Sequence, residues 1–284
     1  MRPAQDPEVV RKAKEQDWYI EFDDVNPQAR EILERYSGIP PGDVVEHVKD
    51  IRERAISIFA YPCIGMVKFL DIEVSKTPCY SEILQRLTSS GATYLEVGCC
   101  FGQELRQLIL DGAPPSSLHG TDLDLDFASL GYALFRDRDR LPPSSFIAAD
   151  ILDPESALNQ LVGKVDIIGA SLFFHLFDYE QGVAIGKRLV GLLAPGGAKG
   201  LMTGGQVGGK EGFEKKSWLG QDLYVYSEDS WRRLWDEVGE ATGTRWEVTV
   251  REDKIVPTSV LASNGHYFVM RWVVRQLRGR CARN

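Results

Sequence analysis

Two glycines and an acidic residue near the middle of the chain have the spacing of a ligand-binding turn. Residues 93–102, TYLEVGCCFG, have the pattern of a short buried strand, a tight turn and the start of a helix. Gly98 lets the backbone approach a ligand closely, and Gly102 allows close contact between strand and helix. The first N–H groups of the following helix, 103–111, would point at that ligand. This stretch predicts the nucleotide-side turn of an α/β sheet.

The carboxylate in this turn indicates which ligand fits. The pattern E-x-G-x-x-x-G lacks one glycine of the dinucleotide fingerprint G-x-G-x-x-G, which disfavours a nicotinamide oxidoreductase. Glu96 would repel a pyrophosphate, and it suits a ligand with an ammonium group on that side. S-adenosyl-L-methionine has an ammonium and a sulfonium, and it has no phosphate. Here the sequence resembles class I S-adenosylmethionine-dependent methyltransferases, whose first motif is an acidic residue followed by such a turn.

A second carboxylate follows the next predicted strand, in the stretch HGTDLD. Asp122 comes after Gly98 at about the separation that places a carboxylate on ribose hydroxyls, and a carboxylate accepts two such hydrogen bonds well. Asp124 is the alternative for this role. Asp122 could instead cap the next helix, although the strand before it favours the ribose interpretation.

The third predicted strand ends in the stretch AADILD. Asp150 could accept a hydrogen bond from the adenine amino group, and Ile151 could supply a backbone N–H and an apolar face. Asp153, which precedes a proline, is better placed to cap a helix. This leaves Asp150 for the ligand.

The fourth predicted strand ends in the stretch ASLFFHLFD, which the resemblance places under the sulfonium and beside the methyl acceptor. Phe173, Phe174 and His175 could form the wall of the methyl-transfer site, because aromatic rings attract a sulfonium through cation–π interactions. The two phenylalanines could equally be core residues. His175 could be a base or an orienting donor, and a structural role is its alternative.

The elements that position these residues alternate between strand and helix, which predicts a parallel sheet with helices on both faces. Strands are expected at 93–97, 117–121, 145–148, 165–170, 198–202, 245–251 and 266–274, and the main helices at 103–111, 127–136, 179–193 and 230–241. We therefore predict an α/β, Rossmann-like class I methyltransferase fold over residues 91–284, with a seven-stranded, mostly parallel sheet. Residues 204–222 are expected to form a glycine-rich loop.

Residues 1–90 are predicted to form a separate helical region that acts as a lid, a dimerisation surface or both. Asp6 and Asn26 each precede a proline, which is typical of a helix cap followed by the first helical residue. Further helices are expected at 29–36, at 44–59 and from Pro78 to residue 87.

Composition excludes several classes of function. The net charge is −8, from 41 acidic and 33 basic residues, which argues against nucleic acid as the main partner. The N-terminus has no apolar signal core, and no apolar run is long enough to span a membrane. Five cysteines without a C-x-x-C pair, and four histidines, predict neither disulfides nor a metal site. A cytoplasmic protein is expected.

Three further stretches indicate one family among the class I methyltransferases. They are YPCIGMVKFLD at 61–71, EVGCCFGQELRQLILDGAP at 96–114, and GYALFRDRDRL at 131–141 with FIAADILD after it. Together they resemble fungal secondary-metabolism methyltransferases of meroterpenoid pathways, over nearly the whole chain. Several members of that family methylate the carboxylic acid of a farnesylated aromatic polyketide. The resemblance implies a homodimer and cofactor contacts from Glu96, Gly98, Asp122, Leu123, Asp150 and Ile151, whereas no substrate residue is carried over.

The pKa of the acceptor group decides whether the methyl transfer needs a base. A carboxyl group with a reference pKa near 4 is ionised at neutral pH and needs no base, whereas a phenol with a pKa near 10 would need one. His175 is the nearest candidate for such a base. The expected loop and the N-terminal region could enclose a prenyl chain through Phe213, Trp218 and Tyr224. Methylation of a phenol, nitrogen or carbon remains an alternative, as does a non-catalytic partner subunit.

Overall fold

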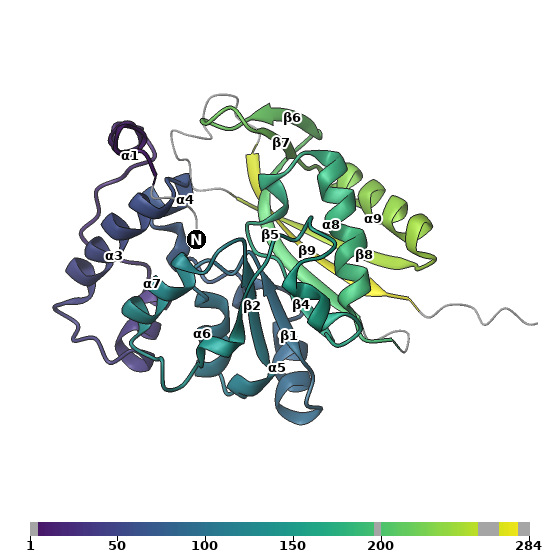
Figure 1. The fold of residues 1–284 in the computed structure, drawn as a ribbon, viewed down its shortest axis with the longest axis horizontal. Coiled ribbons are helices and arrows are strands. Elements are labelled where there is room, and N and C mark those ends of the chain that lie inside the picture. The colour runs from purple at the N-terminus through teal and green to yellow at the C-terminus, as the bar shows by residue number, and fades with distance from the viewer. Residues whose placement is uncertain (1–4, 196–199, 255–266, 278–284) are drawn as a thin grey trace, which may run out of the picture.

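A seven-stranded sheet runs through the computed structural model, which describes residues 5–195, 200–254 and 267–277 of the chain. Its strand order is β3-β2-β1-β4-β5-β9-β8 (Figure 1). The strands are β1 (Tyr94–Val97), β2 (Leu118–Asp122), β3 (Phe146–Ala148), β4 (Ile167–Gly169), β5 (Leu201–Gly209), β8 (Trp246–Lys254) and β9 (Tyr267–Gln276). Strands β1 to β5 are parallel, and β9 is antiparallel to both β5 and β8. The predicted seven-stranded, mostly parallel fold is confirmed.

The strand order reverses at β1, which pairs with β2 on one side and with β4 on the other. In open α/β sheets such a reversal opens a crevice at the carboxyl ends of the strands, where ligands bind. The predicted ligand residues follow β1, β2, β3 and β4, so the topology brings all of them to this edge. The first residues of two predicted strands, 198–199 of the strand at 198–202 and 266 of the strand at 266–274, lie outside the described residues.

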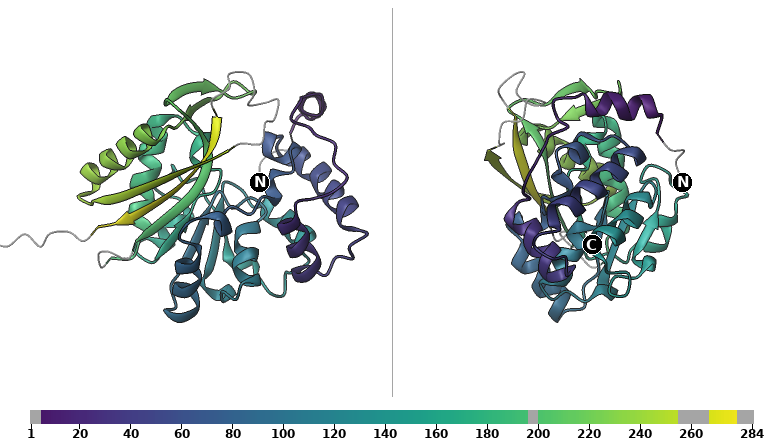
Figure 2. Two further views of the ribbon diagram at one scale, coloured as in Figure 1. Left: turned by 180° about the vertical axis from the view of Figure 1, so that it is seen from behind. Right: turned by 90° about the vertical axis from the view of Figure 1, so that its left-hand side faces the viewer.

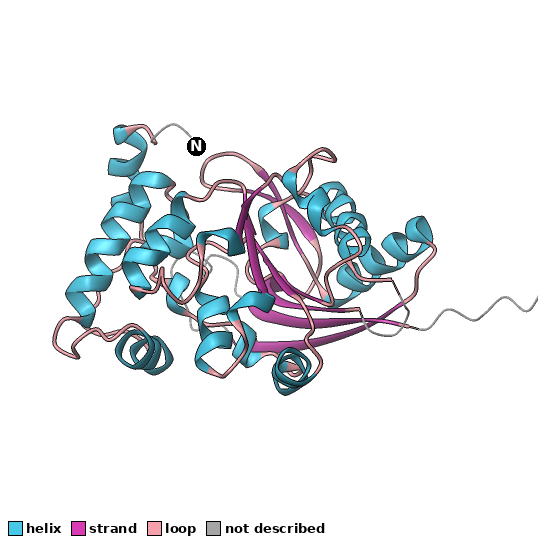
Figure 3. Ribbon diagram, turned by 60° about the horizontal axis from the view of Figure 1, so that its bottom comes forward, coloured by secondary structure: helices cyan, strands magenta, loops and turns pink. Residues whose placement is uncertain are grey.

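Helices cover both faces of the sheet (Figure 3). They are α5 (Tyr80–Ser89), α6 (Gln103–Leu110), α7 (Asp126–Phe135), α8 (Tyr179–Leu192) and α9 (Glu228–Thr242). Successive residues of β1 belong to different cores, because side chains alternate along a strand. Leu95 packs with residues of α8 and α9, and Tyr94 packs with residues of α5 and α6.

The N-terminal helices form a third core against α7. They are α1 (Pro7–Lys14), α2 (Pro27–Glu31), a π-helix at Ile32–Tyr36, α3 (Val44–Ile58) and α4 (Pro62–Gly65). The predicted caps are confirmed, since Asp6 accepts from the N–H of Glu8 and Asn26 from that of Ala29. The helix expected from Pro78 instead begins at Tyr80, after a short 3-10 helix at Val74–Lys76. The predicted division at residue 90 stays a prediction.

The expected loop over 204–222 is largely wrong. Strand β5 continues to Gly209 because β9 pairs with it along its whole length, and a hairpin of β6 (Phe213–Lys216) and β7 (Asp222–Val225) follows. The glycines of β5 allow close packing, since a Cβ at Gly204 would overlap the carbonyl of Ala170. The hairpin and the N-terminal helices stand at the same edge of the sheet (Figure 2).

In the part of the chain that the structure describes, no helix combines the length and apolar character needed to cross a bilayer. Over the same ranges, no three His, Cys, Asp or Glu side chains gather closely enough to hold a metal ion.

Candidate active site

A cavity of about 1070 Å³ opens at the carboxyl edge of the sheet. Its floor comes from the segments that follow β1, β2, β3 and β4, where Gly98, Asp122, Asp150 and Leu172 lie. The N-terminal helices and the β6–β7 hairpin supply the remaining walls. The cavity therefore joins the predicted ligand residues to the two regions expected to enclose an apolar substrate.

Both glycines of the turn have left-handed backbone, with φ of 67° at Gly98 and 69° at Gly102. Gly98 lines the cavity, and a Cβ there would overlap the ring of Phe173. Gly102 does not line it; a Cβ there would meet the guanidinium of Arg106 at 2.6 Å. Glycine is thus required at both positions, and at Gly102 the reason is the packing of the turn.

Asp122 is held by the turn that it faces. Its carboxylate accepts from the backbone N–H of Cys100 at 2.9 Å and of Leu123 at 2.8 Å, and both Asp122 and Leu123 line the cavity. The first turn of α7 is instead bonded by Asp124, which accepts from the N–H of Asp126 at 3.0 Å. Asp122 therefore does not cap this helix, and its carboxylate lies on the cavity wall.

Asp150 and Ile151 also line the cavity, at the end of β3. Asp150 accepts from the backbone N–H of Leu152 at 2.9 Å, so it has a local role beside any ligand contact. Asp153 accepts from the N–H of Glu155 at 2.9 Å, but the helix that follows is a short 3-10 helix at Ala157–Leu161. Ser156, and not Asp153, holds the cap position of that helix, so the expectation that Asp153 caps a helix is wrong.

Glu96 is buried beneath the cavity and is not one of its lining residues. Its carboxylate accepts from the hydroxyl of Tyr94 and from the backbone N–H of Ser171 at 3.1 Å. Glu104, in the first turn of α6, does line the cavity and accepts from the N–H groups of Glu73 and Val74 at 3.0 and 2.8 Å. Burial raises the pKa of both the Glu96 and the Glu104 carboxyl groups.

The three side chains after β4 have different surroundings. Phe173 and His175 line the cavity, whereas Phe174 is fully buried and packs edge-on against Trp231 and Trp272. The structure thus places Phe174 in the core, as its alternative interpretation held. Nδ1 of His175 has no hydrogen-bond partner among the described residues, and burial lowers the pKa of His175 to about 4.

The aromatic residues predicted to contact substrate from the 204–222 region differ in whether they line the cavity. Trp218 lines the cavity from the β6–β7 hairpin, and its ring meets that of Trp18 edge-on at a centroid separation of 5.5 Å. Tyr224 is buried against Tyr179 and Tyr226 and does not line the cavity. Trp218 is therefore placed for a substrate contact, and Tyr224 belongs to the core under the hairpin.

Sequence reasoning missed the charged residues of the cavity wall. Glu73 and Lys76 belong to the segment before α5, Glu104 begins α6, and Arg271 lies on β9. Glu104 could have been found from the sequence, because acidic residues favour the first turn of a helix and this helix begins at the predicted ligand turn. Arg271 gave no local signal, since it reaches the cavity only through the pairing of β9 with β5.

Comparison with known proteins matches this arrangement to one family. The sequence model of the meroterpenoid methyltransferase N-terminal domain matches residues 18–70. The asnovolin E/chermesin D methyltransferase nvfJ of Aspergillus novofumigatus is 44% identical over 250 residues, which cover 87% of each chain. The O-methyltransferase phiE of a fungal species is 42% identical over 83% of this chain and 79% of its own.

Solved structures resemble the chain more remotely. The Burkholderia thailandensis 1,6-didemethyltoxoflavin-N1-methyltransferase, with S-adenosylhomocysteine bound, is 16% identical with a TM-score of 0.48, over 91% of this chain and 93% of its own. The identity and coverage of the fungal relatives, in contrast, are high enough to assign a family. The chain therefore belongs to the family of fungal meroterpenoid methyltransferases.

Proposed function

We propose that the protein transfers a methyl group from S-adenosyl-L-methionine to the carboxylate of a prenylated aromatic acid, which gives a methyl ester. Its family supports methyl transfer in fungal secondary metabolism, and one relative is named an O-methyltransferase. The cavity of about 1070 Å³ exceeds the usual volume of a single ligand site, which supports a cofactor and a second ligand side by side.

The residues at the carboxyl ends of β1, β2 and β3 suit the donor. Asp122 presents a carboxylate, already oriented by two backbone N–H groups, to the ribose diol. Asp150 and Ile151 serve the adenine, and Gly98 lets the backbone approach. When bound, S-adenosyl-L-methionine supplies an activated methyl group on a sulfonium.

Negative charge at the other end of the donor site suits the methionine ammonium. Glu104 lies on the cavity wall, and Glu96 lies just beneath it and fixes the N–H of Ser171 at 3.1 Å. A nearby ammonium would favour the ionised form of both carboxyl groups, whose pKa burial otherwise raises.

The low pKa of His175 is the observation that most favours a carboxyl acceptor. His175 is the one histidine among the described residues that line the cavity, and burial holds its pKa at about 4. Such a weak base is poorly matched to a phenol, whose pKa is near 10. A carboxylate is already ionised and requires only orientation next to the methyl group.

A panel of three acceptors tests this proposal. The enzyme is incubated with labelled S-adenosyl-L-methionine and a farnesylated orsellinic-type acid, the same acid with its phenols methylated, or its primary amide. We expect label in both acids and none in the amide. Label in the amide would instead assign the transfer to a hydroxyl or carbon, and failure to bind the donor would indicate a non-catalytic subunit.

A homodimer, which the family resemblance implies, and a cytoplasmic location, which the cysteine pattern indicates, complete the proposal. Light scattering after gel filtration tests the dimer, with a mass near twice that of the 31.8 kDa chain as the expected result. A mass equal to one chain would contradict it.

A further inference from the structure

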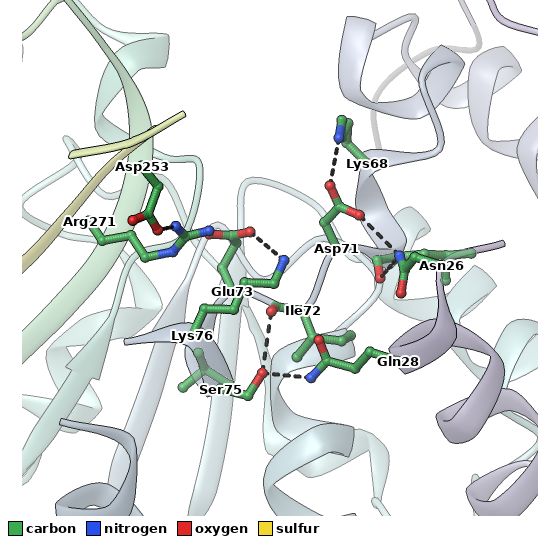
Figure 4. A network of polar contacts seen from close by, with 12 residues as sticks. Asn26, Gln28, Lys68, Asp71, Ile72, Glu73, Ser75, Lys76, Asp253 and Arg271 are labelled. Atoms are coloured by element: carbon green, nitrogen blue, oxygen red, sulfur yellow. Dashed lines mark hydrogen bonds and ion pairs between the residues drawn. The ribbon is translucent and has the colours of Figure 1, made fainter. Parts of the chain in front are cut away.

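A short segment crosses the carboxyl edge of the sheet and joins the two ends of the molecule. This segment, residues 68–76, is called the strap below. On the side of the N-terminal helices, the side-chain amide of Asn26 donates to the Asp71 carboxylate at 3.0 Å, and that of Gln28 donates to the hydroxyl of Ser75 at 2.6 Å. On the side of the sheet, Arg271 of β9 donates to Glu73 (Figure 4). The strap thereby forms a fixed part of the cavity wall.

The end of the strap near β9 belongs to a network of charged side chains that also includes residues of β8 and β9. Glu73 is paired with Lys76 at 2.9 Å and with Arg271 at 2.8 Å. Arg271 also pairs with Asp253, which in turn accepts from Arg251 at 2.9 Å. Three cations share two carboxylates in this network, and the neighbouring carboxyl group, Glu104, has a pKa that burial raises.

Arg271 has an unused donor in this cluster. Its side chain is 8% exposed, and its Nε has no hydrogen-bond partner among the described residues. A buried donor without a partner carries a free-energy cost, and that cost is larger for a charged group. Arg271, Lys76 and Glu73 all line the cavity, so an anionic group bound there would meet this cation-rich wall.

The position of the cluster separates it from the ribose end of the donor. Strand β9 stands four places from β2 in the sheet, which is about 19 Å at about 4.8 Å per strand. Asp122 is the last residue of β2, whereas Arg271 lies on β9. The cluster is thus beyond β4 and β5, away from the ribose end, and it adjoins Glu104 at the methionine end of the donor, because Glu104 accepts from the backbone N–H of Glu73 at 3.0 Å.

We propose that Lys76 and Arg271 form a carboxylate-binding site that positions the ionised carboxyl group of the acceptor. This inference rests on the proposed function. One carboxylate oxygen is held by the two cations, and the other is left to attack the methyl carbon. The carboxylate–methyl bond forms as the sulfonium–methyl bond breaks, and the electron pair stays on sulfur. The neutral ester has lost its charge, so it binds this site more weakly than the acid and leaves readily.

The Lys76→Met variant tests the site by binding, without turnover. Affinities for the farnesylated acid and for its methyl ester are measured with S-adenosylhomocysteine present. We expect the wild-type protein to prefer the acid, and the preference to fall roughly tenfold in the variant, as the loss of a charge-assisted hydrogen bond predicts. The KM for the acid rises accordingly, more than kcat falls.

Lys49→Met is the matched control. Lys49 pairs with Glu46 three residues away at 2.8 Å, and the Lys49 side chain is 34% exposed. Lys76 pairs with Glu73, also three residues away, at 2.9 Å, and the Lys76 side chain is 36% exposed. Lys49 lies on α3 and does not line the cavity. Its variant is expected to keep the wild-type preference for the acid. An Arg271→Lys variant, checked for an unchanged melting temperature, is expected to weaken acid binding as Lys76→Met does.

The α-carboxylate of the cofactor is the alternative ligand for the site formed by Lys76 and Arg271. It is tested by comparing S-adenosylhomocysteine with its analogue that lacks the α-carboxylate. If Lys76→Met removes the difference between these two ligands and leaves the acid-to-ester ratio unchanged, the acceptor assignment is overturned. If it changes neither ratio, the cluster only ties the strap to the sheet, and the site is overturned altogether.

Failure of the proposed function gives a different pattern. If the primary amide in the acceptor panel becomes labelled, the methyl group is not transferred to a carboxylate. The binding ratios would still report whether a carboxylate occupies the site, because they require no methyl transfer.

Discussion

In the proposed function the donor is bound by single carboxylates, and backbone N–H groups fix each of them. Asp122 accepts from Cys100 and Leu123, Asp150 accepts from Leu152, and these bonds orient the carboxylates before any ligand arrives. A preoriented acceptor loses less conformational freedom when it binds. The affinity for the donor is therefore expected to depend on these side chains individually.

Replacement of Asp122 by asparagine is expected to weaken binding of S-adenosyl-L-methionine by roughly tenfold to a hundredfold, as for loss of a charged hydrogen bond. Titration calorimetry measures this change. Asp124→Asn is the control, because Asp124 bonds the first turn of α7. Equal affinities in the two variants would contradict the ribose role of Asp122.

His175 allows a prediction about pH. The unfolded chain takes up a proton on this histidine below its usual pKa of about 6.5, whereas the native protein does so only near 4. Its contribution to stability is therefore present above pH 6.5 and is lost as the pH falls toward 4. His175→Gln is expected to lose less stability than the wild-type protein between pH 7 and pH 4.5, measured by urea unfolding. Equal losses would show that His175 titrates normally.

At the scale of elements, the β6–β7 hairpin and the N-terminal helices close the acceptor half of the cavity. Trp218 from the hairpin meets Trp18 from the segment after α1, and both line the cavity. Neither ring lies among the donor residues at the ends of β1, β2 and β3. The hairpin is therefore expected to influence the acceptor and not the cofactor.

Trp218→Ala is expected to raise the KM for a farnesylated acid about tenfold or more, because a large apolar contact is removed. Steady-state kinetics with varied acceptor measure this effect, and the affinity for S-adenosyl-L-methionine should stay unchanged. Phe213→Ala is the control, since Phe213 lies on the same hairpin, is 40% exposed and does not line the cavity. An unchanged KM in Trp218→Ala would contradict the role of the hairpin.

Local patterns were enough to predict the parallel strands and the residues at their carboxyl ends. Strand β1 is followed by Gly98, β2 ends at Asp122, and Asp150 comes two residues after β3, so this order can be read from local sequence. The course of 204–209 was not legible, because its glycines resemble a loop and become strand only through pairing with β9, some 60 residues later. For the same reason Phe174 and Tyr224 could not be assigned, since Trp231 of α9 covers the ring of Phe174 and Tyr179 of α8 covers that of Tyr224.

At the scale of the whole molecule, a buried ion pair joins the N-terminal helices to the ligand turn. Arg106 and Asp137 are both fully buried, with Nε and Oδ2 2.8 Å apart, and the hydroxyl of Tyr36 donates to the same carboxylate at 2.7 Å. Arg106 also donates to the carbonyl of Phe101 at 2.6 Å, within the turn itself. The position of the turn is thus coupled to the packing of the N-terminal region.

Asp137→Asn is expected to lower the free energy of unfolding by about 3–5 kcal/mol, because it leaves the guanidinium of Arg106 buried without a counter-charge. Chemical denaturation measures this loss. Asp139→Asn, two residues away and exposed, is the control and should change stability by less than about 0.5 kcal/mol. A loss as small as that of the control would show that the ion pair does not hold the two regions together.

Mild alkaline hydrolysis of the methylated product tests the central claim most directly. The enzyme transfers a labelled methyl group to a farnesylated orsellinic-type acid, and mass spectrometry follows the product before and after alkali. A carboxyl acceptor predicts the gain of one labelled methyl group that alkali removes as methanol. A methyl group that survives alkali would contradict the account, because it would lie on a phenol or on carbon.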